Sequence, residues 1–210
     1  MINRHKVFIS YYHHDDQKYK DFLINQTFVD DDYKRKSIFD DYSVGDGDID
    51  DTGMTDEQIR VKIRDEYIKD ANVLILLVGP NTRKRKHIDW EIHGAMFDPE
   101  KNPKMGILVI NLPEINQWVR VSNAEEKSVV GPNVLEWFSL DSRKDFDDKY
   151  PYMPERIIDN FVKGAEITVV NWDTIQNDNY RLMKLIDNAF ERRKNVKYDH
   201  SRPLRRKNSV

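Results

Sequence analysis

The sequence contains no cysteine. This absence excludes disulfides, thiolate metal sites and a cysteine nucleophile, and it is compatible with a reducing compartment. A long hydrophobic run is also missing at the start, where the polar segment 1–6 precedes only a short apolar stretch. We therefore predict neither a signal peptide nor a membrane-spanning helix, and we expect a cytoplasmic protein with no membrane partner.

Neither sign of charge dominates, because 34 lysines and arginines stand against 37 aspartates and glutamates. The formal net charge of -3 gives no general attraction to nucleic acid, so we expect no nucleic-acid partner. Hydrophobic residues make up 39% of the 210 residues, which is more than a disordered chain contains. The length suits one domain with a sizeable core.

Glycine is missing where two large classes of nucleotide-binding enzyme need it. Neither GxGxxG nor GxxxxGK follows the first apolar run, so we expect neither a Rossmann dehydrogenase nor a P-loop enzyme. A response regulator of related fold would need a phosphoacceptor aspartate after the central strand, where this chain has Gly79 and Pro80. The sequence therefore does not favour any of these three classes of protein.

Short apolar runs alternate with amphipathic helical patterns along the chain. Strands are expected at residues 7–9, 37–39, 72–78, 105–110 and 167–170. Helices are expected through residues 22–26, from an N-cap at Thr55, over 88–96 and over 179–193. Such alternation predicts an α/β fold with a flavodoxin-like, parallel five-stranded sheet that carries helices on both faces.

One domain accounts for most of the chain, and we place it at residues 1–198. The segment 111–164 is too long for an ordinary connection, so we interpret it as an elaboration of that domain. Residues 199–210 are basic and carry little apolar content, and we expect them to form a mobile basic tail.

Hydroxyl and aromatic side chains follow the first expected strand. Ligands bind at the carboxyl ends of the strands in an open parallel sheet, and there Ser10, Tyr11 and Tyr12 could hold a ribose or stack on a base. A helix-capping turn is an equally good interpretation. The adjacent His13 and His14 project in different directions and make a poor metal pair without other ligands.

An acidic loop, 40–53, follows the second expected strand, and Asp40 and Asp46 are among its aspartates. Its glycines give it a superficial likeness to a calcium loop, but an EF-hand needs a glutamate at the twelfth position and two flanking helices. A lid over a pocket or a solvated loop fits better. We therefore expect no metal site.

Four consecutive cations, at residues 83–86, precede the helix expected over 88–96. Together with the positive end of the helix dipole they suit a diphosphate, and Arg83 is our candidate contact. The alternative is a solvated basic loop, since four neighbouring side chains cannot all face one ligand.

Glu91 follows Trp90 at the border of the buried face of the same helix. A carboxylate half sheltered beside an aromatic ring can serve as an acid, a base or a stabiliser of a developing cation. Spacing alone does not separate it from the many glutamates that lie on helix surfaces.

Three segments in this order resemble a known family: 7–11, 73–80 and 88–92, the last containing Trp90 and Glu91. The sequence resembles Toll/interleukin-1 receptor (TIR) domains over residues 5–97, and specifically the bacterial TIR-like proteins of the ThsB kind in Thoeris antiphage defence. The resemblance implies a flavodoxin-like fold in which Glu91 is the NAD⁺-cleaving residue. It also implies that the loop 40–53 covers the nicotinamide pocket, with Ser10 and its neighbours contributing from the end of the first strand.

The resemblance implies an enzyme of the NAD⁺ glycohydrolase or ADP-ribosyl cyclase type, for which NAD⁺ is the substrate and no cofactor is needed. The nicotinamide glycosidic bond would break through an oxocarbenium-like state. The product would be an ADP-ribose-derived signal, often cyclic in this family, that activates an effector protein. The aspartate-rich loop and the segment 111–164 depart from a minimal TIR domain, which leaves the product open.

A second hypothesis is a non-catalytic TIR-like scaffold that acts by oligomeric assembly, since TIR-like surfaces self-associate. Trp90 and Glu91, with the hydroxyls of Ser10 and Tyr11 at the same edge, favour the enzyme because assembly alone does not require them.

Overall fold

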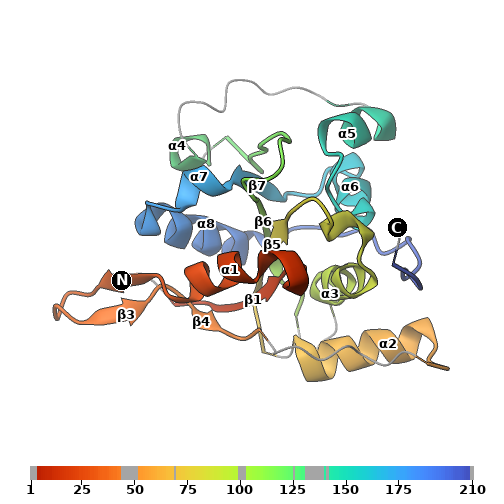
Figure 1. Cartoon of the computed structure of the whole chain (residues 1–210), viewed down its shortest axis with the longest axis horizontal. Helices are drawn as coiled ribbons and strands as arrows, with labels where there is room; N and C mark the ends of the chain where they lie inside the picture. Colours follow the sequence, from red (N-terminus) through yellow and green to blue (C-terminus); the bar gives the residue numbers. More distant parts are fainter. Residues whose placement is uncertain are drawn as a thin grey trace.

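Five parallel strands form the central sheet of the computed structural model, in the order β4-β1-β5-β6-β7 (Figure 1). The structure describes residues 4–43, 52–68, 70–98, 103–124, 126–130, 140 and 142–208, without the side chain of residue 67. The sheet strands are β1 (Lys6–Ser10), β4 (Asp40–Asp41), β5 (Val73–Val78), β6 (Gly106–Asn111) and β7 (Thr168–Asn171). This is the flavodoxin-like arrangement predicted from the sequence.

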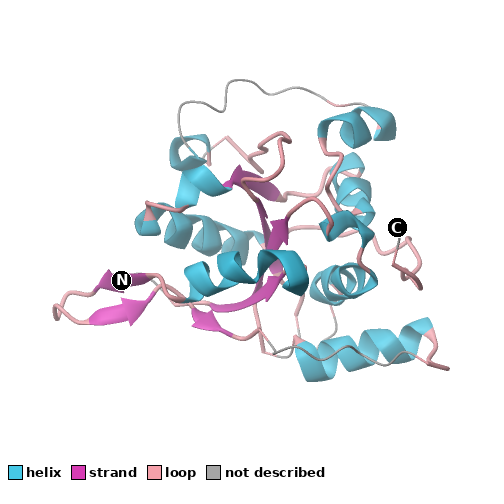
Figure 2. Cartoon of the chain, viewed as in Figure 1, coloured by secondary structure: helices cyan, strands magenta, loops and turns pink. Residues whose placement is uncertain are grey.

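The two central strands are buried along their whole length, because helices cover both faces of the sheet (Figure 2). Every residue of β5 and of β6 is buried, as the continuous apolar runs predict for strands inside a parallel sheet. Successive side chains of β5 point to opposite faces, so Leu74 and Leu76 join one apolar cluster while Val73 and Ile75 join the other.

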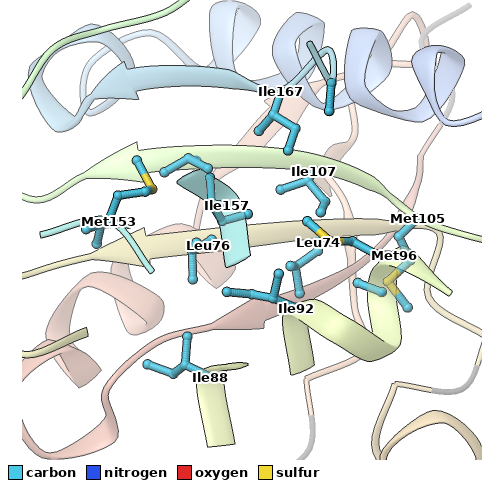
Figure 3. Close-up of a cluster of buried hydrophobic side chains, with 14 of the residues drawn as sticks. Leu74, Leu76, Ile88, Ile92, Met96, Met105, Ile107, Met153, Ile157 and Ile167 are labelled. Carbon is cyan, nitrogen blue, oxygen red and sulfur yellow. The ribbon is translucent and has the colours of Figure 1, made fainter. Parts of the chain in front are cut away.

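Three helices pack on the face that carries Leu74 and Leu76: α2 (Asp56–Lys62), α3 (Lys86–Met96) and α6 (Glu155–Val162). Figure 3 shows this cluster, with Ile88 and Ile92 of α3 and Ile157 of α6 directed at the strands. The opposite face carries α1 (His13–Ile24), α7 (Trp172–Ile175) and α8 (Asn179–Arg192). The apolar face predicted for the last helix is confirmed, because Leu182, Leu185, Ile186 and Ala189 are all buried.

The remaining helical elements are short. They are η1, a π-helical turn (Ile63–Tyr67), η2, a 3-10 turn (Thr82–Lys84), and the helices α4 (Lys127–Val130) and α5 (Arg143–Lys149). Thr55 begins α2 with a capping box in which Gln58 is the reciprocal partner, so the predicted N-cap is confirmed. None of the helices within the described part of the chain is both long enough and apolar enough to cross a membrane.

The second sheet strand lies three residues later than predicted. The sequence places a strand at 37–39, but Ser37 ends a separate antiparallel hairpin of β2 (Thr27–Val29) and β3 (Arg35–Ser37), which projects from the body (Figure 1). Ile38 and Phe39, the apolar residues of the predicted strand, are buried in the core and lie between the hairpin and the sheet strand β4. The strand that pairs with β1 is Asp40–Asp41, so Asp40 is not the start of a loop.

Part of the segment 111–164 is integral to the core. Met153 and, on α6, Ile157, Ile158 and Phe161 are buried in the cluster that covers the first face of the sheet. This helix occupies the position of the crossover between β6 and β7, so the segment contains one of the core layers as well as additional structure.

Residues 199–208 correct the expectation of a mobile tail. Leu204 is buried, Arg202 pairs with Glu155 and Asp159 of α6, and Arg206 pairs with Asp56 of α2. Local composition predicts mobility because it does not reveal that distant carboxylates are available as partners. The described part of this segment is therefore packed against the domain.

Both edges of the sheet are limited in length or covered. The edge strand β4 has two residues. At the opposite edge, Val169 of β7 exchanges both backbone hydrogen bonds with Arg120, at 2.9 and 2.7 Å. The segment around Arg120 therefore lies against the outer side of β7.

Candidate active site

Ser10 and Glu91 meet at the carboxyl end of the sheet. Ser10 is the last residue of β1, and it shares the face of Phe8, which packs toward α3. The Ser10 hydroxyl donates a 2.6 Å hydrogen bond to Oε2 of Glu91 on α3. The structure therefore brings together two of the residues selected from the sequence.

The Glu91 carboxyl is in a desolvated position. Ile88 and Ile92, one turn before it and directly after it on α3, are buried, and the Ser10 side chain is also buried. Burial raises the pKa of Glu91 from about 4.5 to about 7, and the hydrogen bond from Ser10 opposes that rise in part. Glu91 as a whole residue is half-buried, so a carboxyl with a near-neutral pKa lies at the border of the buried face of α3. Such a group can exchange a proton or supply a negative charge near neutral pH.

Ser43 is a further hydroxyl at this edge, and the pattern of apolar runs does not indicate it. Its Oγ accepts a 2.9 Å hydrogen bond from the backbone N–H of Ile9, next to Ser10. The rule that ligands bind where parallel strands end would have identified Ser43 if the second sheet strand had been placed at Asp40–Asp41. Asp46, the other candidate in the loop that follows, lies outside the described residues.

Tyr11 and Tyr12 point in different directions. Tyr11 is buried in the cluster on the opposite face of the sheet, and its hydroxyl donates to Gln17 at 2.6 Å. Tyr12 packs against the cluster on the Glu91 face, and the Arg85 guanidinium lies 3.7 Å from the centre of its ring. The structure therefore places Tyr12, but not Tyr11, on the face that carries Glu91.

Asp40 and Arg83 form their ion pairs with partners other than Ser10 and Glu91. Asp40 is opposite Lys6, at the start of β1, and forms an ion pair with Arg4, whereas Ser10 ends that strand. Arg83 donates to Asp147 of α5 at 2.8 Å. Its charge is thus directed at the segment between β6 and β7, a pairing across 64 residues that local spacing does not reveal.

Trp90 is a buried side chain. It is 1% exposed, and its indole N–H donates a 2.8 Å hydrogen bond to the carbonyl of Arg205. It therefore contacts the C-terminal segment, and its neighbour Glu91 contacts β1, as adjacent residues on a helix face different sides.

Asp16 is a second buried carboxyl near this edge that the sequence analysis did not select. It lies on α1 against Gly79, the residue after β5, where a Cβ would stand 3.0 Å from the carboxylate. Burial and the nearby charges of Asp15 and Glu114 raise the pKa of Asp16 to about 6. The glycine that follows the central strand thus makes room for a carboxyl group.

No three histidine, aspartate or glutamate side chains in the described ranges gather closely enough to hold a metal ion. An open pocket of about 450 Å³ lies between α6 and the C-terminal segment, with Lys163 and Ser201 among its lining residues, and it does not include Ser10 or Glu91.

Comparison with known proteins adds one match. A family model described as "Thoeris protein ThsB, TIR-like domain" matches residues 8–117, slightly more than half of the 210 residues. The matched range contains Ser10, Ser43 and Glu91, together with the last three residues of β1 and the whole of strands β4, β5 and β6. No curated protein and no solved structure shows a significant match to the chain.

Proposed function

The chain belongs to the TIR-like domain family of the Thoeris antiphage-defence protein ThsB, and from this premise we propose that it is an enzyme that cleaves NAD⁺ with Glu91 as the central catalytic carboxylate. NAD⁺ is the substrate in this proposal, and no resident cofactor is involved. The product is an ADP-ribose-derived nucleotide, linear or cyclic, that activates an effector protein.

The Ser10–Glu91 pair is the observation that supports this proposal most strongly. Its 2.6 Å hydrogen bond lies at the carboxyl end of the parallel sheet, where ligands bind in open α/β folds. The carboxyl is desolvated, and its pKa of about 7 leaves a large ionised fraction at neutral pH. A cationic nicotinamide ring nearby would increase that fraction, because an opposite charge favours the carboxylate.

The proposed reaction begins with the bond between the ribose C1′ and the nicotinamide nitrogen. This bond breaks with its electron pair moving to the ring nitrogen, so neutral nicotinamide departs and positive charge develops on the ribose. The Glu91 carboxylate stabilises that charge, and the Ser10 hydroxyl fixes the position of the carboxylate. Water or an internal nucleophile of the ADP-ribose then attacks C1′. Attack by water transfers a proton to Glu91 or to solvent, which balances the reaction.

The nucleophile determines the product. Attack by water gives ADP-ribose, attack by a nitrogen of the substrate's own adenine gives a cyclic isomer, and attack by another acceptor gives a conjugate. The geometry around C1′ decides among the three, because a correctly oriented internal nucleophile competes with water through its high effective concentration.

The alternative function is a non-catalytic scaffold that self-associates through TIR-like surfaces. The projecting hairpin favours it, since Tyr33 between β2 and β3 is 91% exposed and Val29 is 59% exposed. A desolvated glutamate, however, costs stability when it is ionised, and assembly through a hairpin does not require that cost. We therefore favour the enzyme.

The test compares the wild-type protein with Glu91→Gln at several protein concentrations. Each is incubated with NAD⁺, and nicotinamide and the nucleotide products are separated by chromatography with mass detection. Glu166→Gln, the same change at an exposed position, is the matched control. We expect release by the wild type and the control, and at least about a hundredfold less by Glu91→Gln. If the wild type stays inactive, even with extracts of phage-infected cells, the scaffold becomes the better explanation.

A further inference from the structure

Residues 202–208, which we term the C-terminal clasp, run along the N-terminal half of α3. The Asn208 side-chain oxygen accepts a 2.9 Å hydrogen bond from the backbone N–H of Lys86, the first residue of the helix. The Arg205 backbone N–H donates to Asp89 at 2.9 Å, and the Arg205 carbonyl accepts from the Trp90 indole at 2.8 Å. The clasp thus contacts α3 at three positions, the backbone of Lys86 and the side chains of Asp89 and Trp90.

Arg156 of α6 links the clasp to α3, because it forms hydrogen bonds with both of them. Its guanidinium is completely buried and donates two 3.0 Å hydrogen bonds to the Asp89 carboxylate. It also donates to the carbonyls of Arg202 and Pro203, at 2.9 and 3.1 Å. Asp89 therefore receives donors from α6 and from the clasp, and these three parts of the chain share one buried polar network.

The C-terminal half of α3 is held by different contacts. Gly94 packs so closely on η1 and the residue after it that a Cβ would lie 2.8 Å from Ile68 and 3.0 Å from Ile63. Arg64 of η1 donates to the Gly94 carbonyl at 3.1 Å. Along α3, Glu91 lies between the contacts of Gly94 with η1 and the contacts with the clasp. Both sets of contacts therefore determine the position of the Glu91 carboxyl relative to Ser10.

The start of α3 lacks a cap from its own flanking residue. Arg85 occupies the N-cap position and makes no side-chain capping hydrogen bond. Asn208 supplies the acceptor instead, from 122 residues further along the chain. A capping acceptor stabilises a helix start, so the first turn of α3 depends in part on the clasp.

We propose that the C-terminal clasp is a positioning element for catalysis, and that it holds the N-terminal half of α3 so that Glu91 remains in register with Ser10. This inference rests on the proposed function, because it assigns the clasp a role in the same site. Clasp residues act through α3 and do not touch the reacting atoms. Misplacement of a catalytic group by about 1 Å can reduce a rate by about a hundredfold, so loosening of the helix start has a large effect on turnover.

The test removes two clasp contacts while keeping the apolar packing. In the double variant Asn208→Leu with Trp90→Phe, the cap acceptor and the indole donor are lost. Asn208→Asp keeps an acceptor at the helix start and is the conservative comparison, and Lys207→Ala changes an exposed clasp residue as a control. Thermal unfolding checks that each variant is folded before it is compared.

Two readouts separate positioning from general destabilisation. We expect kcat for nicotinamide release to fall at least tenfold in the double variant, with KM changed less than threefold. We also expect the pKa of Glu91, followed by carbon NMR of labelled glutamate carboxyls, to move from about 7 toward its ordinary value, because a loosened helix admits water. Asn208→Asp and Lys207→Ala should resemble the wild type in both measurements.

A double variant that is folded and retains both the wild-type kcat and the wild-type Glu91 pKa would overturn the role of the clasp. If the double variant does not fold, the single change Asn208→Leu decides on the same readouts, since Asn208 is exposed. The NMR titration does not depend on turnover. An inactive wild-type protein would therefore refute the proposed function, while the titration would still decide whether the clasp positions Glu91.

Discussion

Ser10 and Glu91 are 81 residues apart in the sequence, and a 2.6 Å hydrogen bond joins their side chains. The bond exists because β1 ends at Ser10 and α3 packs across that end on the same face of the sheet. A hydroxyl donor lowers the pKa of a carboxyl, whereas desolvation raises it, and the raised pKa of Glu91 shows that desolvation dominates.

Substitution of Ser10 by alanine should shift the pH dependence of nicotinamide release. The proposed mechanism needs ionised Glu91, so kcat/KM rises with pH through the pKa of about 7. Loss of the donor raises that pKa further, and the rising limb should move to higher pH by roughly 1 unit. Ser43→Ala is the matched control, because Ser43 bonds the Ile9 backbone and does not bond Glu91 in the structure. An unmoved limb in Ser10→Ala would show that the hydrogen bond does not act on Glu91.

Glu91→Gln should be more stable than the wild type at alkaline pH. Below pH 4.5 the carboxyl is protonated in both the folded and the unfolded state, so it does not make the stability of the wild type depend on pH. Between pH 4.5 and about 7 the unfolded state ionises while the folded state keeps its proton, and the wild type loses stability as the pH rises. Above that range the loss of stability is complete and amounts to roughly 3 kcal/mol.

Urea unfolding of both proteins at pH 5 and at pH 8 measures this difference. The advantage of Glu91→Gln should be small at pH 5 and larger at pH 8, and Glu166→Gln should show no such trend. A constant difference between the two pH values would mean that the Glu91 carboxyl is not desolvated in the folded protein.

Two glycines should differ in their tolerance of alanine. A Cβ at Gly106 would stand 1.9 Å from the backbone carbonyl oxygen of Ala189 on α8, which cannot move without displacing the helix. We expect Gly106→Ala to lower the free energy of unfolding by more than about 3 kcal/mol. At Gly94 the nearest atoms are the ends of the Ile68 and Ile63 side chains, which can rotate, so about 1–2 kcal/mol is expected. Chemical denaturation of both variants tests the order, and an equal cost would contradict it.

Arg156→Met should be strongly destabilising, because it leaves the Asp89 carboxylate buried without its guanidinium partner. The loss is expected to be roughly 3–5 kcal/mol. Asp89→Asn introduced into that variant removes the unpaired charge and still offers an oxygen to the Arg205 N–H, so the double variant should regain part of the loss. A double-mutant cycle on the free energy of unfolding measures the coupling between the two side chains. Purely additive costs would show that the pair does not act as a unit.

Local sequence patterns predicted the parts of the fold that depend on local periodicity. The buried run 73–78 and the capped start of α2 at Thr55 are visible in the sequence because each is set by neighbouring residues. The same holds for Ser10, since the end of an apolar strand indicates the functional edge of a parallel sheet. For Glu91 the spacing does not distinguish a catalytic glutamate from one on a helix surface, and only the family resemblance implies a catalytic role.

The structure adds contacts that the sequence does not reveal where a residue bonds a distant partner. The phosphate contact expected of Arg83 stays a prediction, and in the structure its guanidinium donates to Asp147. The basic composition of residues 199–210 predicts a mobile tail, whereas Arg156, Asp89 and Asp159 provide partners for Arg202 and Arg205 within it. Asp40 was misplaced because the hairpin that precedes it moves the sheet strand along the chain. Periodicity describes which side of an element is buried, and it does not describe pairing across the fold.

The two edges of the central sheet restrict how copies of this protein can join. Unpaired backbone groups on a sheet edge can recruit a strand from another molecule and start aggregation. Here β4 offers only two residues for such pairing, and the Arg120 segment already uses both backbone groups of Val169 on β7. Cross-molecular strand addition is therefore disfavoured at both described edges. An ordered assembly of this protein would have to form through its helices, its loops or the β2–β3 hairpin.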